Sequence, residues 1–257
     1  YKFMNAQLTE LLTQYGKVDG IWFDGWWDHD EDSIPFNWQL PEQYRLIHSL
    51  QPACIIGNNH HQTPFEGEDM QMFERDIPGE NKSGLSGQSI SQLPLETCQT
   101  MNGMWGYKIK DQDYKSTKDL IRLLVRTAAK GANLLLNIGP QPNGELPATA
   151  LDRLKGIGEW LNGKAGESIY ATVSGGVTAG DSIVTTMGKG RKAPLYIHVL
   201  TDKAMPQISL PLEKKPRRAT NLTTGSSVKM HKKGKDVVFS PTDMNDNETD
   251  YIIKVEF

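Results

Sequence analysis

Two stretches of the sequence bring acidic side chains close to aromatic ones, a combination suited to sugar binding. The first is residues 18–25, an apolar run that ends in Asp24-Gly25 and is followed at once by two tryptophans. The second is residues 64–76, which is acidic and aromatic and is rich in candidates for a second catalytic carboxylate. Flat apolar faces can meet a sugar ring while carboxylates accept hydrogen bonds from its hydroxyl groups. We therefore expect carbohydrate chemistry around Asp24.

The element that positions Asp24 is a strand preceded by a helix. Apolar side chains recur at helical spacing through residues 3–15, and Gly16 is the residue type that commonly ends a helix. A short apolar strand then runs to Phe23, which places Asp24 at the carboxyl end of that strand. Because Asp-Gly is also a common turn dipeptide, a simple turn role for Asp24 is the alternative.

The same order of elements recurs after the tryptophan loop. A helix is predicted over residues 41–50 and a buried strand over residues 53–57, which ends in Asn58-Asn59-His60-His61. In parallel α/β barrels the carboxyl ends of the strands carry the chemistry, which favours a catalytic role for Asp24. Consecutive side chains in extended backbone point to opposite faces, so His60 and His61 cannot easily share a metal ion. We expect no metal and no cofactor, and a contact from one imidazole, that of His60, to a substrate hydroxyl.

Further strand, loop and helix units follow along the chain. Residues 79–92 form a Gly/Ser-rich loop of a length that is typical of functional lids or of disordered segments. Strands are predicted over residues 95–99 and 133–138, and helices from Ser116 or Thr117 to Gly131 and over residues 147–162. In the first of these helices the spacing predicts that Leu120 and Leu124 are buried and that Arg122 points outward.

Beyond Tyr170 the pattern becomes one of short β-rich runs separated by turn residues. We therefore predict an α/β fold in which a partial (β/α)8-like, TIM-type barrel is followed by a small antiparallel β-sandwich. The predicted domains are residues 1–171, the C-terminal part of the catalytic barrel, and residues 172–257, the sandwich.

Composition restricts the classes of partner. The 257 residues carry a formal net charge of −3, which argues against nucleic acid because proteins that bind it usually display a concentrated basic surface. No apolar run is long enough to span a membrane. Two cysteines, Cys54 and Cys98, do not make a disulfide framework. The chain begins with Tyr1 and enters a helix directly, so we expect it to be part of a longer protein.

Several motifs, in order along the first two thirds of the chain, resemble the α-L-fucosidases of glycoside hydrolase family 29. They are Gln7-Leu8-Thr9-Glu10-Leu11 with Tyr15-Gly16, Trp22-Phe23-Asp24-Gly25, Trp105-Gly106-Tyr107, Leu134-Leu135-Leu136-Asn137-Ile138-Gly139-Pro140, and Gly158-Glu159-Trp160-Leu161 with Ile169-Tyr170. The ordered set makes the resemblance specific, whereas Trp-Phe-Asp-Gly alone would be a weak signal.

The resemblance implies a retaining hydrolase that removes terminal α-L-fucose from glycans or glycoconjugates by double displacement. Asp24 matches the family's strand-end nucleophile. The acid/base is expected within residues 69–74, and we choose Glu74, with Glu68 second and Glu66 third. The resemblance also implies substrate contacts from three side chains and export to the periplasm, the lysosome or the cell exterior. The three expected substrate-binding residues are Trp22, His60 and Trp105.

The sequence departs from the family's pattern in two places. Related enzymes often carry arginine where His60 stands. The family's first barrel strands, with a His-Trp-Gly motif, have no counterpart here, so we expect that the missing N-terminal half of the barrel is required. The alternatives to a fucosidase are a non-catalytic carbohydrate-binding protein and a related retaining glycosidase with another sugar preference. A lectin would have no need for a facing pair of carboxylates.

Overall fold

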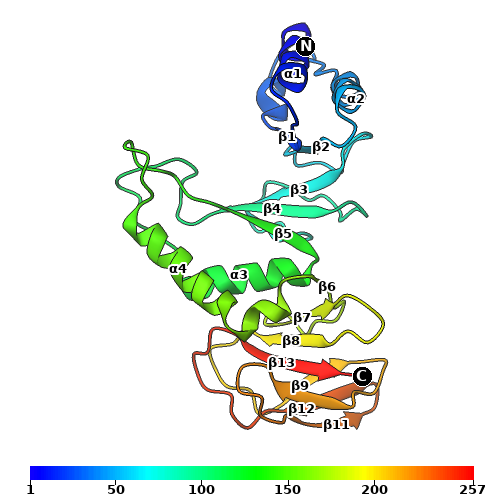
Figure 1. Ribbon diagram of the computed structural model, residues 1–257, viewed down its shortest axis with the longest axis vertical. Coiled ribbons are helices and arrows are strands. Elements are labelled where there is room, and N and C mark those ends of the chain that lie inside the picture. Colours follow the sequence, from blue (N-terminus) through cyan, green and yellow to red (C-terminus); the bar gives the residue numbers. More distant parts are fainter. The chain divides into compact units, whose positions relative to one another are not determined.

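A computed structural model describes residues 1–257, which form two compact units, Tyr1–Gln99 and Thr100–Phe257. Each unit has its own layers of secondary structure (Figure 1). No helix is both long enough and apolar enough to cross a membrane. The predicted division at residue 171 stays a prediction.

The first unit holds two helices and four parallel strands of a five-stranded sheet. Its elements are α1 (Lys2–Gln14), β1 (Gly20–Phe23), the 3-10 helix η1 (Trp26–His29), α2 (Leu40–Leu50), β2 (Ile55–Asn58), β3 (Met70–Glu74) and β4 (Leu95–Thr100). The strands lie in sequence order and every neighbouring pair is parallel. The carboxyl ends of all four strands therefore lie along one edge of the sheet, as the sequence predicted for β1, β2 and β4.

The core of the first unit is formed where α1 and α2 pack on the sheet. Leu8 and Leu12, one turn apart on α1, are buried against Tyr44 and Ile47 of α2. Ile56 of β2 belongs to the same cluster. Burial of these side chains, each worth about 1.5–3 kcal/mol, fixes the strands and hence the loops that follow them.

The second unit begins with helices and one further strand. They are α3 (Thr117–Ala129), β5 (Ala132–Asn137), α4 (Ala148–Asn162) and the 3-10 helix η2 (Lys164–Ser168). Ser116 caps α3, because its hydroxyl accepts a hydrogen bond from the Asp119 backbone N–H at 3.1 Å, as predicted. The prediction for Arg122 was wrong: its side chain is only 15% exposed, and Leu123 and Val125 are buried as well. The helix is covered on two sides, by α4 and by strands of the sandwich, so helical spacing alone could not identify a solvent face.

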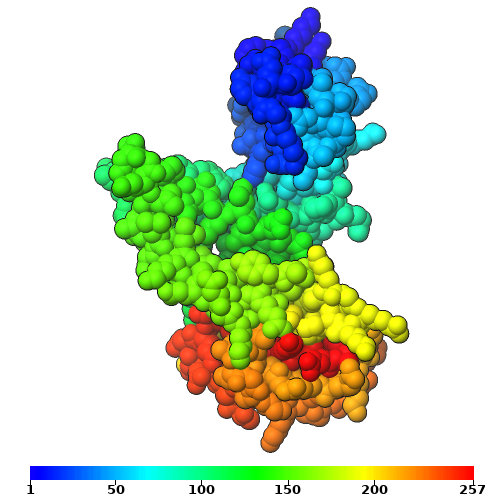
Figure 2. All heavy atoms as spheres, viewed as in Figure 1, coloured from blue at the N-terminus to red at the C-terminus, as the bar shows by residue number.

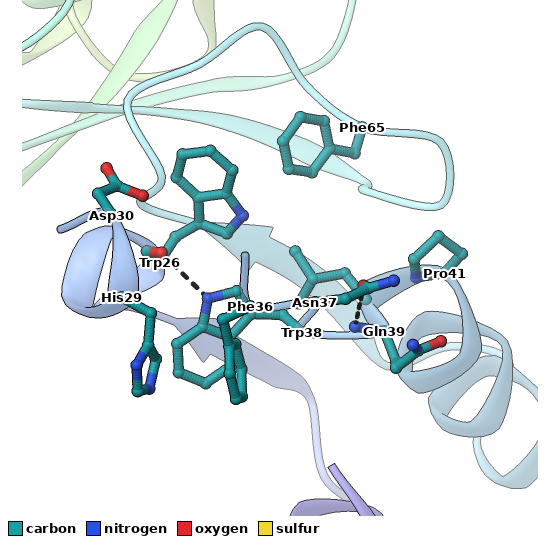
Figure 3. A pocket seen from close by; sticks show the side chains of 10 residues that line it. Trp26, His29, Asp30, Phe36, Asn37, Trp38, Gln39, Pro41 and Phe65 are labelled. Atoms are coloured by element: carbon teal, nitrogen blue, oxygen red, sulfur yellow. Dashed lines mark hydrogen bonds between the residues drawn. The ribbon is translucent and has the colours of Figure 1, made fainter. Parts of the chain in front are cut away.

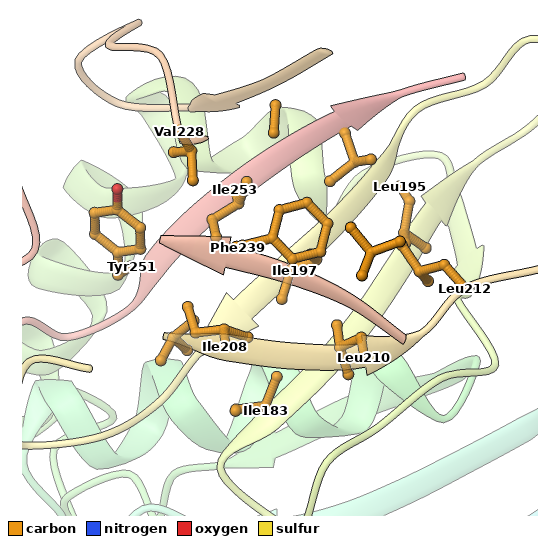
Figure 4. Close-up of a cluster of buried hydrophobic side chains, with 14 residues drawn as sticks. Ile183, Leu195, Ile197, Ile208, Leu210, Leu212, Val228, Phe239, Tyr251 and Ile253 are labelled. Carbon is orange, nitrogen blue, oxygen red and sulfur yellow. The ribbon is translucent and has the colours of Figure 1, made fainter. Parts of the chain in front are cut away.

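The rest of the second unit is an antiparallel β-sandwich, whose residues pack into one body in yellow to red (Figure 2). One sheet has the order β10-β13-β8-β7-β6 and the other the order β11-β12-β9. The strands are β6 (Thr172–Ser174), β7 (Ile183–Gly188), β8 (Leu195–Val199), β9 (Ile208–Pro211), β10 (Arg218–Asn221), β11 (Lys229–Lys233), β12 (Asp236–Ser240) and β13 (Tyr251–Glu256). Side chains of the two sheets interdigitate between them, including Ile197 and Ile253 from one sheet and Ile208 and Phe239 from the other (Figure 4). The predicted sandwich is confirmed.

Candidate active site

Polar side chains meet at the carboxyl ends of β1, β2 and β3. Phe23 pairs with Asn58 in the parallel register, so the next residues, Asp24 and Asn59, are neighbours across the two strands. The Asn59 backbone N–H donates to the Phe23 carbonyl at 2.9 Å, which extends the ladder by one bond. Glu74 is the last residue of β3, the next strand in the sheet. Three adjacent strands therefore deliver Asp24, Asn59 and Glu74 to one place.

The amide of Asn59 joins the two carboxylates. Its Nδ2 lies 3.3 Å from Asp24 Oδ1 and 2.8 Å from Glu74 Oε2. Because both contacts come from one nitrogen, these two oxygens lie no more than about 6 Å apart. The carboxyl groups are thus close enough to act on opposite sides of one bond in a substrate.

The surroundings of the two carboxylates differ. Asp24 is exposed, whereas the Glu74 side chain is 14% exposed and lies against His61. His61 Nε2 is 3.1 Å from Glu74 Oε2, and the imidazole stacks on the indole of Trp27 with ring centroids 4.8 Å apart and planes 11° from parallel. His61 has a φ of 60°, a left-handed conformation that is uncommon outside glycine. This backbone turn directs the ring toward Glu74.

Glu68 and Glu66, the other two acid/base candidates, do not lie with Asp24. The Glu68 side chain is 1% exposed, and its Oε1 accepts a hydrogen bond from the Tyr44 hydroxyl at 2.8 Å. The same hydroxyl oxygen accepts one from Asn58 Nδ2, also at 2.8 Å. Burial raises the pKa of Tyr44 well above its ordinary value, so the phenol stays protonated as a donor. Glu66 is exposed and forms no side-chain hydrogen bond, so Glu74 is the one candidate that shares a partner with Asp24.

His60 lies within the network of Glu68. Its Nδ1 accepts a hydrogen bond from the Gln62 backbone N–H at 2.9 Å, so the ring proton is on Nε2, which faces Glu68 Oε1 at 2.9 Å. The residue is 3% exposed, and both ring nitrogens are engaged within the protein. A contact between His60 and a sugar hydroxyl stays a prediction, and the imidazole that lies beside the paired carboxylates is that of His61.

The other two predicted substrate contacts are placed as follows. Trp22 lies in β1 and is 42% exposed. Trp105 belongs to the second unit, where its carbonyl accepts a hydrogen bond from Asn137 Nδ2 at 2.7 Å. A Cβ at Gly139 would lie 2.4 Å from the Tyr107 backbone nitrogen. Only glycine at residue 139 therefore permits its close approach to the motif Trp105-Gly106-Tyr107. The contacts of Trp22 and Trp105 with a substrate stay predictions.

The Gly/Ser-rich loop is tied to the first unit by hydrogen bonds. The Asp76 carboxylate accepts from the backbone N–H groups of Lys82 and Ser83, at 3.0 Å each. Ser86 Oγ donates to the His61 carbonyl at 3.1 Å, which links the loop to the residue that contacts Glu74. No group of three or more His, Cys, Asp or Glu side chains is arranged to hold a metal ion. Burial raises the pKa of Cys98, opposite Glu74 on β4, to about 12, so this thiol stays protonated.

Comparison with known proteins adds independent evidence. Residues 1–166 match the model of the family described as alpha-L-fucosidase. The chain is similar to a plasma alpha-L-fucosidase of Homo sapiens, with 39% identity over 188 residues, 59% of this chain and 40% of that protein. It is also similar to the solved structure of alpha-L-fucosidase isoenzyme 1 from Paenibacillus thiaminolyticus, with 30% identity, a TM-score of 0.77, and coverage of 99% of this chain and 61% of that one.

A second solved structure has the same fold at lower identity. It is an α-L-fucosidase of glycoside hydrolase family 29 from Bacteroides thetaiotaomicron, trapped as a covalent intermediate with 2-fluoro-fucosyl fluoride. Its identity is 23%, its TM-score is 0.77, and the match covers 99% of this chain and 60% of that one. The likeness to solved structures confirms the predicted class, a partial barrel followed by a sandwich. The present chain spans about two fifths of the human relative and about three fifths of the solved structures.

Proposed function

The chain belongs to the α-L-fucosidase family, and on that premise we propose that it supplies the catalytic carboxylates of a retaining α-L-fucosidase. The proposed reaction removes terminal α-L-fucose from glycans or glycoconjugates in two displacements through a covalent fucosyl-enzyme. The observation that carries the proposal is the bridge of Asn59 between Asp24 and Glu74. A lectin would need no such pair.

The separation of the two carboxyl groups supports retention of configuration. Carboxyl groups of retaining glycosidases are about 5–5.5 Å apart, whereas inverting enzymes leave about 6.5–9.5 Å for a water molecule. The bound of about 6 Å between Asp24 Oδ1 and Glu74 Oε2 favours the retaining arrangement. The Bacteroides thetaiotaomicron fucosidase, trapped as a covalent intermediate, provides a precedent on the same fold.

Asp24 and Glu74 take different roles because their surroundings differ. In the first step an oxygen of Asp24 bonds to C1 of fucose while the C1–O bond to the leaving group breaks. At the same time Glu74 gives its proton to the oxygen of the leaving group. In the second step Glu74 takes a proton from water, the water oxygen bonds to C1, and the ester bond to Asp24 breaks. The exposed Asp24 is accessible to the sugar, whereas Glu74 is mostly buried and lies against His61, which restricts water around its carboxyl group.

The rest of the sugar site is proposed on the family resemblance. Trp22, His60 and Trp105 are proposed to contact the substrate, and the full reaction is proposed to use barrel residues present in the longer relatives. Export to the cell exterior, lysosome or periplasm is also proposed. The human relative's description as a plasma enzyme supports a secreted form.

Two substitutions in the full-length protein test the roles. Asp24→Gly should abolish hydrolysis of an aryl α-L-fucoside, and added azide should restore turnover with formation of a fucosyl azide. Glu74→Ala should slow substrates with poor leaving groups by about 10²–10⁴-fold and activated aryl fucosides far less, because only poor leaving groups need full protonation. Glu66→Ala, at an exposed residue of the same stretch, is the matched control. Wild-type turnover by Asp24→Gly would refute the nucleophile assignment, and an unchanged leaving-group dependence in Glu74→Ala would refute the acid/base assignment.

A further inference from the structure

A pocket of 570 Å³ lies at one end of the β-sandwich, within the second unit. We call it the sandwich pocket. Its volume falls in the range of about 300–1,000 Å³ that is usual for small-molecule sites. None of the residues assigned to the proposed reaction lines it. The sandwich pocket is therefore a candidate site for a ligand other than the fucoside.

The floor of the sandwich pocket is apolar and continues the core of the sandwich. Leu195 of β8 and Leu212, which follows β9, come from opposite sheets and lie at the same end of the core cluster (Figure 4). Val177 and Phe257 pack against the same cluster and also line the pocket. Met187 of β7 completes the floor and is 36% exposed, so it presents apolar surface to a ligand. A hydrocarbon that covers these side chains is removed from water, which favours its binding.

Three cationic side chains also line the sandwich pocket. Arg191 and Lys192 lie in the loop between β7 and β8, and Lys214 follows β9. All three are exposed, and none of them forms an ion pair or a side-chain hydrogen bond within the protein. Glu213 is the one acidic side chain in the lining, so three positive charges against one negative charge leave a side-chain charge of +2. Because the whole chain has a formal charge of −3, positive charge is concentrated at this pocket.

Hydrogen bonds fix the walls of the sandwich pocket. The backbone of Val177 is held by Thr185 of β7, whose hydroxyl donates to the Val177 carbonyl at 2.6 Å and accepts from the Val177 N–H at 3.2 Å. The loop between β7 and β8 is closed by a bond from the Gly188 N–H to the Pro194 carbonyl at 3.0 Å. A preformed site loses little conformational entropy when its ligand binds.

The lining suits a hydrocarbon with an anionic group better than it suits a sugar. No side chain of Ser, Thr, Tyr, Asn, Gln, His or Trp lines the sandwich pocket, so it offers few partners to the many hydroxyl groups of a sugar. The smaller pocket of the first unit differs, because Trp26, Asn37 and Trp38 give it indole rings and an amide (Figure 3). An inorganic anion would leave the apolar floor of the sandwich pocket uncovered. A guanidinium beside two ammonium groups matches a carboxylate, to which the guanidinium can donate two parallel hydrogen bonds.

We propose that the sandwich pocket binds a small amphipathic anion, a monocarboxylate with an unbranched hydrocarbon chain of medium length. The hydrocarbon covers Met187, Leu195 and Leu212, and the carboxylate binds the cations, with Arg191 as its bidentate partner. The ligand is a free molecule, because the cations and the apolar side chains line one pocket of limited volume. The proposal does not depend on the proposed function, since no residue of the candidate active site takes part.

Isothermal titration calorimetry with decanoate, below the concentration at which it forms micelles, tests the proposal on the 257-residue chain. Decanoate should bind at one site. Octanoate should bind about 10-fold more weakly, because its chain removes two fewer methylene groups from water. Decanol, which lacks the charge, and decyltrimethylammonium, which reverses it, should each bind at least about 10-fold more weakly than decanoate.

Two substitutions locate the site. Arg191→Glu should weaken decanoate binding by about 10-fold or more, because a carboxylate replaces the bidentate cation. Met187→Asp should weaken it by a similar factor of about 10, because it places a charge at the apolar floor. Lys232→Glu is the matched control, since Lys232 is exposed, lies on β11 and does not line the pocket. It should leave the affinity within about 2-fold of wild type. Arg191 and Met187 are exposed too, so circular-dichroism melts of the variants should match the wild type.

Absence of saturable decanoate binding would overturn the proposal, as would an unchanged affinity in either Arg191→Glu or Met187→Asp. Equal affinities for decanol and decanoate would overturn it as well, because the cations would then have no part in binding. Binding to vesicles that contain phosphatidylglycerol, lost in Arg191→Glu and without any binding of decanoate, would overturn it in favour of a membrane surface.

Discussion

The phenol of Tyr44 tests how much the buried network of Tyr44, Asn58 and Glu68 contributes to stability. The hydroxyl donates to Glu68 Oε1 and accepts from Asn58 Nδ2, each at 2.8 Å, and Tyr44 is 1% exposed. Tyr44→Phe removes only this oxygen. Glu68 Oε1 keeps its contact with His60, but the Asn58 amide nitrogen loses the partner it has. A buried polar group without a partner costs about 1–3 kcal/mol, so we expect the free energy of unfolding of the first unit to fall by about 2 kcal/mol.

The assay is urea unfolding at 25 °C followed by tryptophan fluorescence. The chain has six tryptophans, and Trp22, Trp26, Trp27 and Trp38 lie in the first unit, so the signal mainly follows that unit. With a urea dependence of about 1–3 kcal/mol per molar, the midpoint should fall by about 1 M. Tyr15→Phe is the matched control, because Tyr15 is 68% exposed and its hydroxyl bonds only to the exposed Glu10. It should shift the midpoint by less than about 0.3 M.

A Tyr44→Phe midpoint within about 0.3 M of wild type would refute this reasoning. It would mean that Asn58 finds another partner at little cost, so that the hydroxyl is dispensable. Equal destabilisation by Tyr15→Phe would refute it too, because the effect would then not depend on burial.

Two further predictions concern the second unit. The Arg122 guanidinium donates to three carbonyls, those of Thr201, Glu248 and Thr249. Arg122→Ala should therefore lower the free energy of unfolding by about 2–4 kcal/mol, measured by calorimetry. Lys155→Ala, at an exposed residue, is the control, and an equal effect of both substitutions would contradict the prediction. Burial alone would raise the pKa of Asp243, but hydrogen bonds from Ser226, Tyr251, Thr224 and Asn221 outweigh it and lower the pKa to about 2. A carboxyl group whose pKa is lower in the folded state stabilises the fold at pH values above its pKa in the unfolded state, near 4. That stability is lost as the pH falls toward 2. Asp243→Asn should therefore lower the free energy of unfolding at pH 6 by about 1 kcal/mol after solvent screening. It should also reduce the loss of stability that the wild type shows between pH 4 and pH 2. An unchanged dependence of the melting temperature on pH, measured by circular dichroism, would contradict this.

The sequence predicted that Asp24 lies near further polar side chains, because the ends of parallel strands follow a simple rule. Short apolar runs ending at Phe23 and near Asn58 indicated strands, and parallel strands present their carboxyl ends at one edge. The first of these strands was expected to be buried, but only Phe23 of β1 is. β3 was not recognised as a strand, although residues 64–76 were identified as the source of the acid. Met70, Gln71 and Met72 lack the β-branched or aromatic character that marks a strand, and β3 forms because both of its neighbours pair with it.

Other features depend on contacts that sequence spacing does not encode. Arg122 of α3 was expected in solvent, but its partners Thr201 and Thr249 are 79 and 127 residues away along the chain. Leu120 is buried as predicted, but Leu124, which the same spacing predicted to be buried, is only half-buried. Periodicity does not reveal that a second layer, the sandwich, covers the opposite face.

Four consecutive residues, Asn58 to His61, divide their contacts between Glu68 and Glu74. Asn58 and His60 contact the Tyr44–Glu68 network, whereas Asn59 and His61 contact Glu74. Successive side chains of extended backbone point to opposite faces, so Asn58 and Asn59, at the end of β2, point toward Glu68 and Glu74 respectively. His61 could not be placed from the sequence, because its positive φ is a local departure from extended backbone. An insertion of one residue after Asn58 would exchange the two sets of contacts and direct an amide away from Asp24. The register of β2 with β1 is therefore what makes Asp24 and Glu74 a pair.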